Sequence, residues 1–185
     1  MAHNRKKVIF CDNSLKAQIR FRLPVMQAYR KAGWEVVAIA STDCPWPEGE
    51  LYRNFKFYPV SLQRGGMNPF SDLRYWWSLL KIYRRERPDY IFHYTVKPNI
   101  YGAFAATLLK IPFAMFVVGL GYIFSSQSLG ARIGRAMYNK AFSRADKVIV
   151  INKNNFDVIS SQGVVDPSRL VLLPGGEGLD IEFFK

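Results

Sequence analysis

One short polar segment of the sequence combines functional groups that can bind an anion or the hydroxyls of a sugar. Tyr94-Thr95-Val96-Lys97-Pro98-Asn99 comes at the end of an apolar run and before a stretch of small residues. It offers a hydroxyl, a cation and an amide. A helix that begins at Pro98 would add backbone N–H donors and a partial positive charge. We predict that Thr95, Lys97 and Asn99 bind a substrate; a solvated polar loop is the alternative.

His93 directly precedes that segment, and the only other histidine is His3 in the amino-terminal tail. An imidazole titrates near neutral pH, so His93 could act as a catalytic general base. His93 also lies near the end of an apolar run that is typical of a buried strand. A structural histidine with satisfied hydrogen bonds is therefore at least as good an interpretation, and the sequence leaves both open.

Two further segments follow apolar runs in the same way. Asp12-Asn13-Ser14 stands where many nucleotide-binding folds carry a glycine-rich phosphate loop. It has no glycine, which argues against an ATPase or a nicotinamide-dependent dehydrogenase. Gly119-Leu120-Gly121-Tyr122 has paired glycines that would let a ligand approach the backbone. It is not a dinucleotide-binding fingerprint, because the third glycine is missing and we expect no helix to begin directly there.

The elements that must position these residues alternate along the chain. Apolar runs of strand length are separated by helical patterns, and such runs are typical of strands buried on both faces. We therefore predict an α/β fold of the Rossmann-like, doubly wound type with a mostly parallel sheet. Ligands bind beyond the carboxyl ends of the strands in such sheets. The predicted strands are residues 7–12, 34–40, 55–60, 89–95, 112–118, 146–152 and 170–173.

Length and composition limit the class of protein. The 185 residues suffice for one domain, and 49% hydrophobic content excludes a disordered chain. Two cysteines exclude a disulfide scaffold and a cysteine-based metal site, and we expect no metal. The most apolar run, residues 111–124, is interrupted by Pro112 and is shorter than the ~20 residues of a membrane span, so we expect a cytoplasmic protein. The net charge of +12 predicts an anionic partner.

Basic residues gather in two places that could contact an anionic membrane. One cluster follows the first strand, and the other ends a long helix that Ser71 or Asp72 would begin. The spacing of that helix predicts one apolar face, which consists of Leu73, Trp76, Trp77, Leu80 and Tyr83. A core position for at least one tryptophan and a solvated helix end are the alternative. The predicted membrane contacts are Lys16, Arg20, Arg22, Trp76, Lys81, Arg84 and Arg85.

Several of these segments together resemble one enzyme family. The sequence is similar to the N-terminal half of retaining glycosyltransferases of family 4, which have the GT-B fold. The branch it resembles comprises bacterial enzymes of capsule and lipopolysaccharide O-antigen biosynthesis. The specific motifs are residues 94–102, YTVKPNIYG, and 119–124, GLGYIF. The supporting segments are Phe21-Arg22, Asn68-Pro69, Arg87-Pro88-Asp89, Ile151-Asn152 and Leu173-Pro174-Gly175.

The resemblance implies a two-domain enzyme that moves a hexose or N-acetylhexosamine from a nucleotide sugar, a UDP-sugar by expectation, to a polyprenyl-diphosphate-linked glycan. Residues 1–174 would be the acceptor-side domain, which would contact the inner face of the plasma membrane and bind no cofactor. Residues 175–185 would begin the hinge to a donor-binding domain absent from this chain, so the chain alone would be inactive. Lys97 and Asn99 would bind the acceptor. Gly119, Gly121 and Tyr122 would line the cleft near the transferred sugar, and Asn13 and Ser14 would reach the donor.

Two other functions fit parts of the sequence. Arg and Lys residues interleaved with aromatic residues would suit a basic module that binds single-stranded nucleic acid or a membrane surface without catalysis. Most aromatic residues, however, have core spacing, and no RNA-binding motif is present. A complete small enzyme that uses His93 is the other alternative, although the sequence has no recognisable triad, metal set or phosphate loop.

Overall fold

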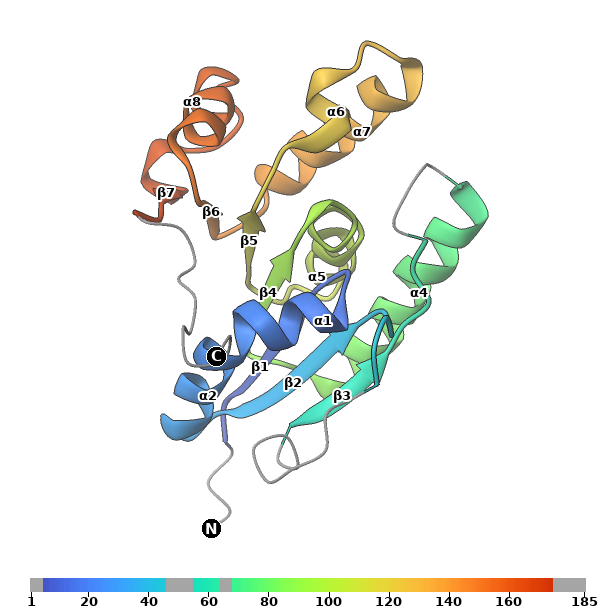
Figure 1. The fold of residues 1–185 in the computed structure, drawn as a ribbon, viewed down its shortest axis with the longest axis vertical. Helices are drawn as coiled ribbons and strands as arrows, with labels where there is room; N and C mark the ends of the chain where they lie inside the picture. Colours follow the sequence, from blue (N-terminus) through green and yellow to red (C-terminus); the bar gives the residue numbers. More distant parts are fainter. Residues whose placement is uncertain (1–4, 46–54, 64–67, 175–185) are drawn as a thin grey trace.

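Seven parallel strands form one sheet in the order β3-β2-β1-β4-β5-β6-β7 (Figure 1). The computed structural model describes residues 5–45, 55–63 and 68–174. All seven strands lie where the sequence predicts them, and the predicted parallel, doubly wound sheet is confirmed. The strands are β1 (Lys7–Cys11), β2 (Glu35–Ala40), β3 (Lys56–Pro59), β4 (Tyr90–Tyr94), β5 (Phe113–Val117), β6 (Lys147–Val150) and β7 (Leu170–Leu172).

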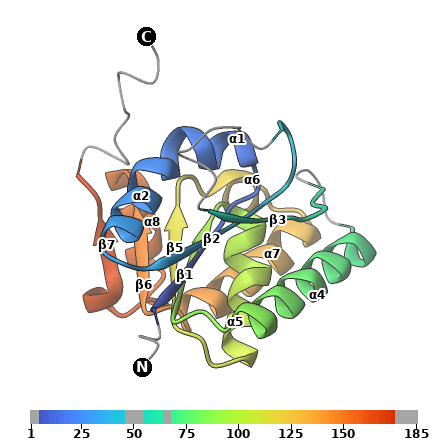
Figure 2. The same cartoon turned by 90° about the horizontal axis from the view of Figure 1, so that it is seen from below.

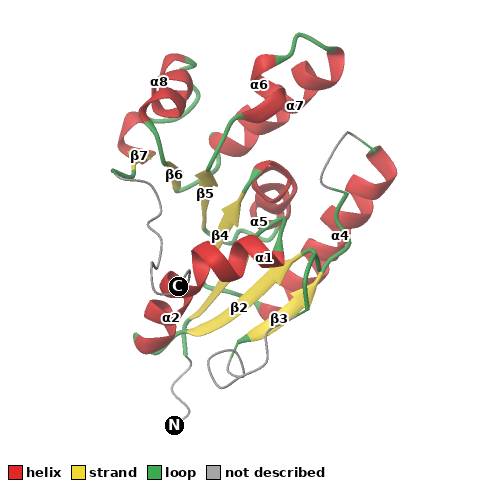
Figure 3. Cartoon of the chain, in the orientation of Figure 1, coloured by secondary structure: helices red, strands yellow, loops and turns green. Residues whose placement is uncertain are grey.

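Outside the β2–β3 connection, helices link successive strands, as the alternation of red and yellow in Figure 3 shows. Two of the connections contain a π-helical segment, a helix wound more widely than an α-helix. The helical elements are α1 (Leu15–Ala17), the π-helical η1 (Gln18–Arg22), α2 (Leu23–Lys31), α4 (Pro69–Glu86), the π-helical η2 (Pro98–Gly102), α5 (Ala103–Leu108), α6 (Gly121–Ser125), α7 (Leu129–Phe142), α8 (Lys153–Ser161) and the short 3₁₀ helix η3 (Pro167–Arg169).

The helices form a layer on each face of the sheet (Figure 2). On one face, α2 packs Leu23 and Met26 against Val8 and Phe10 of β1. On the other face, α4, η2, α5, α7 and α8 pack against the larger core, which contains Ile9, Ile91 and Met115. Adjacent residues of a strand point to opposite faces, so the continuous apolar runs serve both layers.

Helix α4 differs from its prediction in its start and in its buried face. Asn68 caps it, accepting hydrogen bonds from the N–H groups of Phe70 and Ser71 at 3.1 and 3.3 Å, and Pro69 follows at the first position. The predicted caps Ser71 and Asp72 lie inside the helix. The fully buried positions are Asp72, Tyr75, Leu79, Tyr83 and Glu86.

The predicted core face of α4 is therefore rotated. Trp76 and Leu80 are partly buried and pack against the core, whereas Leu73 and Trp77 are exposed. The apolar residues of α4 extend around more of the helix than the core covers, so periodicity alone could not show which of them face inward.

Candidate functional site

Two loops meet at the centre of the sheet, where the strand order reverses. Cys11 of β1 pairs with His93 of β4, so residues 12–14 and 95–97 follow neighbouring strands at the carboxyl edge. We call these two segments the switch-point loops. Ligands of open parallel sheets bind beyond this edge, where the connections diverge to opposite faces. The predicted residues Asn13, Ser14, Thr95 and Lys97 all belong to these loops.

A π-helical segment follows each switch-point loop. Segment η1 lies in the helix after β1, and η2 lies in the helix after β4. π-Helical turns are rare and occur frequently at functional sites. The ring of Pro24 would clash with the carbonyl of Arg20 in a regular α-helix, which favours the wider turn of η1. The π-helical segments therefore indicate the same carboxyl edge of the sheet as the predicted binding residues.

Thr95 has a left-handed backbone conformation, with φ at 69°. This region is unfavourable for a β-branched residue and costs of the order of 1–3 kcal/mol. The Thr95 hydroxyl donates a hydrogen bond to the carbonyl of Tyr94. Strain of this kind persists only where the surrounding structure enforces it, and it gathers at functional sites.

In the first switch-point loop, Ser14 has a structural role. Its Oγ accepts a hydrogen bond from the N–H of Ala17 at 3.0 Å, capping α1, and donates one to Oδ2 of Asp43 at 2.6 Å. Asn13 remains partly exposed, and its N–H donates to Oδ1 of the buried Asp12 at 2.7 Å. Of the two predicted donor-side residues, Asn13 is the one better placed to meet a ligand.

Arg22 lies buried beneath this edge, so the prediction that it contacts a membrane is wrong. Its Nε lies 3.3 Å from Oδ2 of Asp12, and both side chains are almost fully buried. Its guanidinium carbon lies 4.1 Å from the ring centre of Tyr94. The sequence could not reveal this, because η1 turns Arg22 toward the sheet while Arg20 stays exposed.

In the second switch-point loop, Lys97 forms an ion pair with Asp72, which also accepts a hydrogen bond from Tyr101. The sequence did not single out either partner for binding. The Nζ of Lys97 lies 2.6 Å from Oδ1 of Asp72, which is almost completely buried. The other carboxylate oxygen of Asp72 accepts a hydrogen bond from the hydroxyl of Tyr101 at 2.9 Å. The ammonium group therefore points to α4 with much of its charge neutralised. The sequence pattern indicates Asp72 only as a possible helix cap and does not predict its ion pair with Lys97.

Asn99 is fully buried in η2. Its Nδ2 donates hydrogen bonds to the carbonyl of Phe116 and to the hydroxyl of Tyr138, both at 2.8 Å. The amide thus ties η2 to β5 and α7. This geometry favours a structural role for Asn99 over the predicted contact with substrate.

His93 is also fully buried, which favours the structural interpretation over the catalytic one. Its Nε2 lies 2.9 Å from the hydroxyl of Tyr83, and its ring packs edge-on against Phe113. Burial lowers the pKa of His93 to about 3, so the imidazole is neutral at physiological pH. A side chain without solvent access has no route to a substrate in this conformation.

The paired glycines lie beyond the neighbouring strand β5. Gly119 is exposed, and no heavy atom lies within 4 Å of the position a Cβ would take there. Gly121 has a φ of 56° and begins α6, so the expectation that no helix begins there is wrong. Tyr122 is the second residue of α6, and its side chain lies outside the described part of the structure.

The two predicted basic clusters lie on opposite faces of the sheet. Lys16 and Arg20 are exposed on α1 and η1, whereas Lys81, Arg84 and Arg85 are exposed on α4. Trp76 packs against the core, and its neighbour Trp77 is the exposed tryptophan of the pair. One flat surface cannot contact both clusters.

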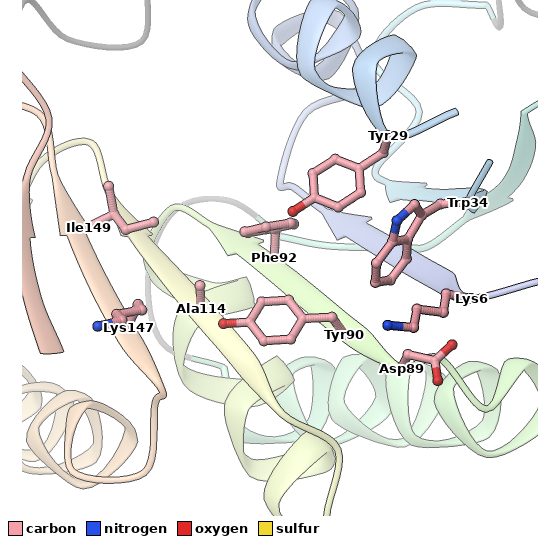
Figure 4. A pocket seen from close by; sticks show the side chains of 9 residues that line it. All are labelled: Lys6, Tyr29, Trp34, Asp89, Tyr90, Phe92, Ala114, Lys147 and Ile149. Atoms are coloured by element: carbon pink, nitrogen blue, oxygen red, sulfur yellow. The ribbon is translucent and has the colours of Figure 1, made fainter. Parts of the chain in front are cut away.

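A pocket of about 400 Å³ lies elsewhere, toward the amino ends of the strands on the α2 face (Figure 4). Aromatic side chains line much of it, and Lys6, Asp89 and Lys147 stand at its border; the aromatic residues are Tyr29, Trp34, Tyr90 and Phe92. Because ligands of parallel sheets bind at the carboxyl edge, we do not assign the functional site to this pocket.

Residues 5–45, 55–63 and 68–174 contain no group of three or more His, Cys, Asp or Glu side chains that could hold a metal ion. Among the same residues, no helix is both long and apolar enough to cross a membrane.

The strand order and the alternation of strands and helices define a Rossmann-like α/β domain. Within this class the family is established by sequence. The family model of the glycosyl transferase 4-like domain matches residues 20–176, and the chain belongs to that family. The resemblance inferred from the motifs is confirmed at this level.

Three known proteins show the range of similarity. An N,N'-diacetylbacillosaminyl-diphospho-undecaprenol alpha-1,3-N-acetylgalactosaminyltransferase of Campylobacter jejuni is 26% identical over 94% of this chain and 47% of its own length. MurG of Acinetobacter baumannii has a TM-score of 0.57 at 17% identity, over 96% of this chain and 47% of that structure. The UDP-GlcNAc 2-epimerase of Neisseria meningitidis, solved with UDP-GlcNAc bound, has a TM-score of 0.63 at 13% identity, over 90% of this chain and 46% of that structure.

These structural similarities establish the fold. The chain spans about half the length of each of these proteins.

Proposed function

We propose that this chain is the acceptor-binding domain of a retaining glycosyltransferase of bacterial cell-surface polysaccharide biosynthesis. The enzyme transfers a hexose or N-acetylhexosamine from a nucleotide sugar to a polyprenyl-diphosphate-linked glycan. The observation that carries this proposal is the family match over residues 20–176, which includes the second switch-point loop and Gly119–Gly121. The Campylobacter relative supports the acceptor class, because its name specifies a diphospho-undecaprenol acceptor.

The described side chains suggest how an acceptor would be held. Thr95 is partly exposed at the switch point, and the helix that begins after it presents its positive end to a diphosphate. Asn13, which is also partly exposed, faces the donor in this proposal. Gly119, which has open space around it, would allow the sugar to approach the backbone. Lys97 contributes through the ammonium protons that Asp72 does not use. Ser14, Asn99 and His93 support the loops from beneath.

The remaining parts of the proposed enzyme lie beyond residue 174. We assign residues 1–174 to the acceptor-side domain and residues 175–185, which lie outside the described residues, to the start of a hinge. A second domain binds the donor, which is a UDP-sugar in this proposal. The acceptor is a membrane lipid, so the enzyme works as a peripheral protein at the cytoplasmic face of the plasma membrane. The domain alone then binds acceptor without catalysing transfer.

The test is a titration of the isotopically labelled 185-residue chain with farnesyl-diphosphate-linked N,N'-diacetylbacillosamine, a short-chain form of the acceptor in the relative's name, followed by amide NMR. We expect the largest shifts in residues 12–14, 95–97 and 119–121, and smaller shifts there with inorganic pyrophosphate. Shifts confined to the aromatic pocket of Figure 4, or no shifts at millimolar probe, would overturn the assignment of the site.

No observation favours the nucleic-acid alternative. The exposed aromatic residues of the described part are Phe21, Phe70 and Trp77, and they lie on two different faces of the sheet. A stacking platform needs successive aromatic faces along one basic groove. The net charge of +12 still predicts some attraction to nucleic acid. The same NMR titration should therefore be repeated with an unstructured oligonucleotide at two salt concentrations.

A further inference from the structure

The outer face of α4 begins with large apolar side chains. Phe70, Leu73 and Trp77 are 86%, 61% and 50% exposed. Their spacing of three and four residues places them in one stripe along the helix. Scattered exposed apolar residues need no explanation, but three large ones in one stripe indicate a surface that water does not cover in the working protein.

The same stripe becomes basic toward the end of the helix. Lys81, Arg84 and Arg85 continue the spacing, and all three are exposed. The Nζ of Lys81 lies 5.5 Å from the ring centre of Trp77, at the point where the apolar half meets the basic half. The outer face of α4 is therefore apolar at the amino end and cationic at the carboxyl end.

Helix α7 repeats the apolar end of this pattern. Its first two turns expose Leu129 and Ile133, with the exposed Arg132 between them. Helices α4 and α7 lie on the same face of the sheet, and each leads to the amino end of the next parallel strand. Both helices therefore begin toward the carboxyl edge, as Figure 1 shows. The exposed apolar side chains gather on the side of the switch-point loops.

We propose that this domain docks obliquely on an anionic bilayer, with the first turns of α4 and α7 in the interfacial region. Lys81, Arg84 and Arg85 then lie over the headgroups. Apolar burial and attraction to anionic lipid both contribute to binding of this kind. The inference rests on the proposed function in one respect: the lipid-linked acceptor is the reason why this protein binds a membrane. Its new content is the face and the tilt, which direct the carboxyl edge of the sheet toward the lipid.

The opposite face of the sheet is excluded from this contact. Lys16 and Arg20 lie there, and the apolar residues near them, Phe21 and Val25, are only 37% and 39% exposed. The two faces provide a matched pair of variants. Arg84→Glu with Arg85→Glu, and Lys16→Glu with Arg20→Glu, each lower the net charge by the same amount, so overall attraction to the membrane falls equally in both.

The test is cosedimentation with vesicles of phosphatidylcholine and phosphatidylglycerol, 3:1, that contain no polyprenyl lipid and no sugar donor. We expect the α4 charge pair to weaken binding about 30-fold or more, because each basic residue near such a surface contributes about fivefold. Phe70→Ser with Leu73→Ser should weaken it at least about tenfold through lost apolar burial. The Lys16/Arg20 pair should change it less than about threefold, and thermal unfolding verifies that each variant is folded.

A second measurement tests the tilt. Brominated lipids should quench the fluorescence of the bound protein, and Trp77→Phe should abolish most of that quenching. Equal losses for both charge pairs would mean that net charge alone drives binding and would overturn the proposal. Quenching that survives Trp77→Phe would overturn the tilt. Vesicle binding that matches these expectations without farnesyl-diphosphate-sugar binding would reject the acceptor site alone, so the two proposals fail separately.

Discussion

At the scale of single residues, the contact between Gly102 and His93 is the tightest constraint near the site. A Cβ on Gly102 would lie 2.5 Å from two ring atoms of His93 and 3.1 Å from the hydroxyl of Tyr83. Gly102→Ala should therefore lower the free energy of unfolding by about 2–4 kcal/mol, measured by urea denaturation. Gly119→Ala, where the Cβ has open space, should stay within about 0.5 kcal/mol. Equal effects would contradict the packing.

His93 should make stability depend on pH in a defined direction. Its pKa is about 3 in the folded protein, because burial disfavours the charged form, and about 6.5 in an unfolded chain. The unfolded state therefore binds an extra proton as pH falls below about 6.5. We expect the free energy of unfolding to drop by about 2–3 kcal/mol between pH 7 and pH 4.5.

His93→Gln should remove that slope, whatever it does to stability at pH 7. NMR shifts of the imidazole ring would follow the titration of His93. A midpoint for His93 above pH 5.5 would show that the imidazole is reached by solvent, and it would restore the catalytic interpretation.

Relief of the strained backbone at Thr95 should stabilise the protein and weaken acceptor binding. Thr95→Asn suits the left-handed conformation better, so we expect the free energy of unfolding to rise by about 1 kcal/mol. The same variant loses the threonine hydroxyl at the switch point and should weaken binding of the farnesyl-diphosphate sugar at least about threefold. A variant that is less stable and binds normally would show that the strain has no functional meaning.

At the scale of elements, Glu86 fastens the end of α4 to the sheet. Its carboxylate accepts hydrogen bonds from Lys7 at 2.9 Å, from Lys56 at 2.6 Å and from the hydroxyl of Tyr58. Burial raises the pKa of Glu86, but these three hydrogen bonds lower it more, to about 2. The stabilisation is present above about pH 4.5 and is lost as pH falls toward 2.

Glu86→Gln should therefore destabilise the protein by about 3 kcal/mol at pH 7, because it removes the buried negative charge that Lys7, Lys56 and Tyr58 share. Asp157→Asn is the matched control, since it breaks the exposed pair with Lys153 and should cost less than about 0.5 kcal/mol. Thermal unfolding at pH 7 and pH 3 measures both. A Glu86→Gln effect as small as that of Asp157→Asn would mean that α4 is held by apolar packing alone.

Elements were easier to predict from the sequence than the contacts of single side chains. The seven strands followed from apolar runs separated by turn residues. The pairing of Lys97 with Asp72 could not be predicted, because it joins a loop to a helix 25 residues earlier. The burial of Arg22 and the exposure of Trp77 depend on how η1 and α4 are rotated about their axes. Arg22 follows a π-helical turn, and α4 is apolar on several sides, so a period of 3.6 residues predicted neither.

At the scale of the whole molecule, the sheet is covered unevenly. Among the described helices, only those of the α1–α2 connection pack on one face, and they contact β1, β2 and β4. On that face, Ala114 of β5 and Ile149 of β6 line the open pocket of Figure 4. The opposite face carries α4, α5, α7 and α8. Stability should therefore fall from the centre of the sheet toward β7.

Native-state hydrogen exchange should show this gradient. We expect the amides of β1 and β4, which pair on both sides, to exchange only through global unfolding. The three-residue edge strand β7 should exchange at least about 100-fold faster through local opening. Uniform protection across all seven strands would show that the described layers already stabilise the whole sheet.

The two π-helical segments have a consequence for how relatives of this protein diverge. A π-helical turn holds about one residue more than an α-helical turn. A single-residue deletion in η2 could therefore restore a regular helix, whereas Pro24 opposes a regular helix at η1. Residues outside η2 would nearly keep their positions, because the deletion removes only the extra residue of the wider turn. Loss or gain of one codon could thus replace Asn99 by a neighbour beneath the switch-point loops and leave the strands in place. Short insertions and deletions, and not substitutions alone, would be a source of new acceptor specificity on this scaffold.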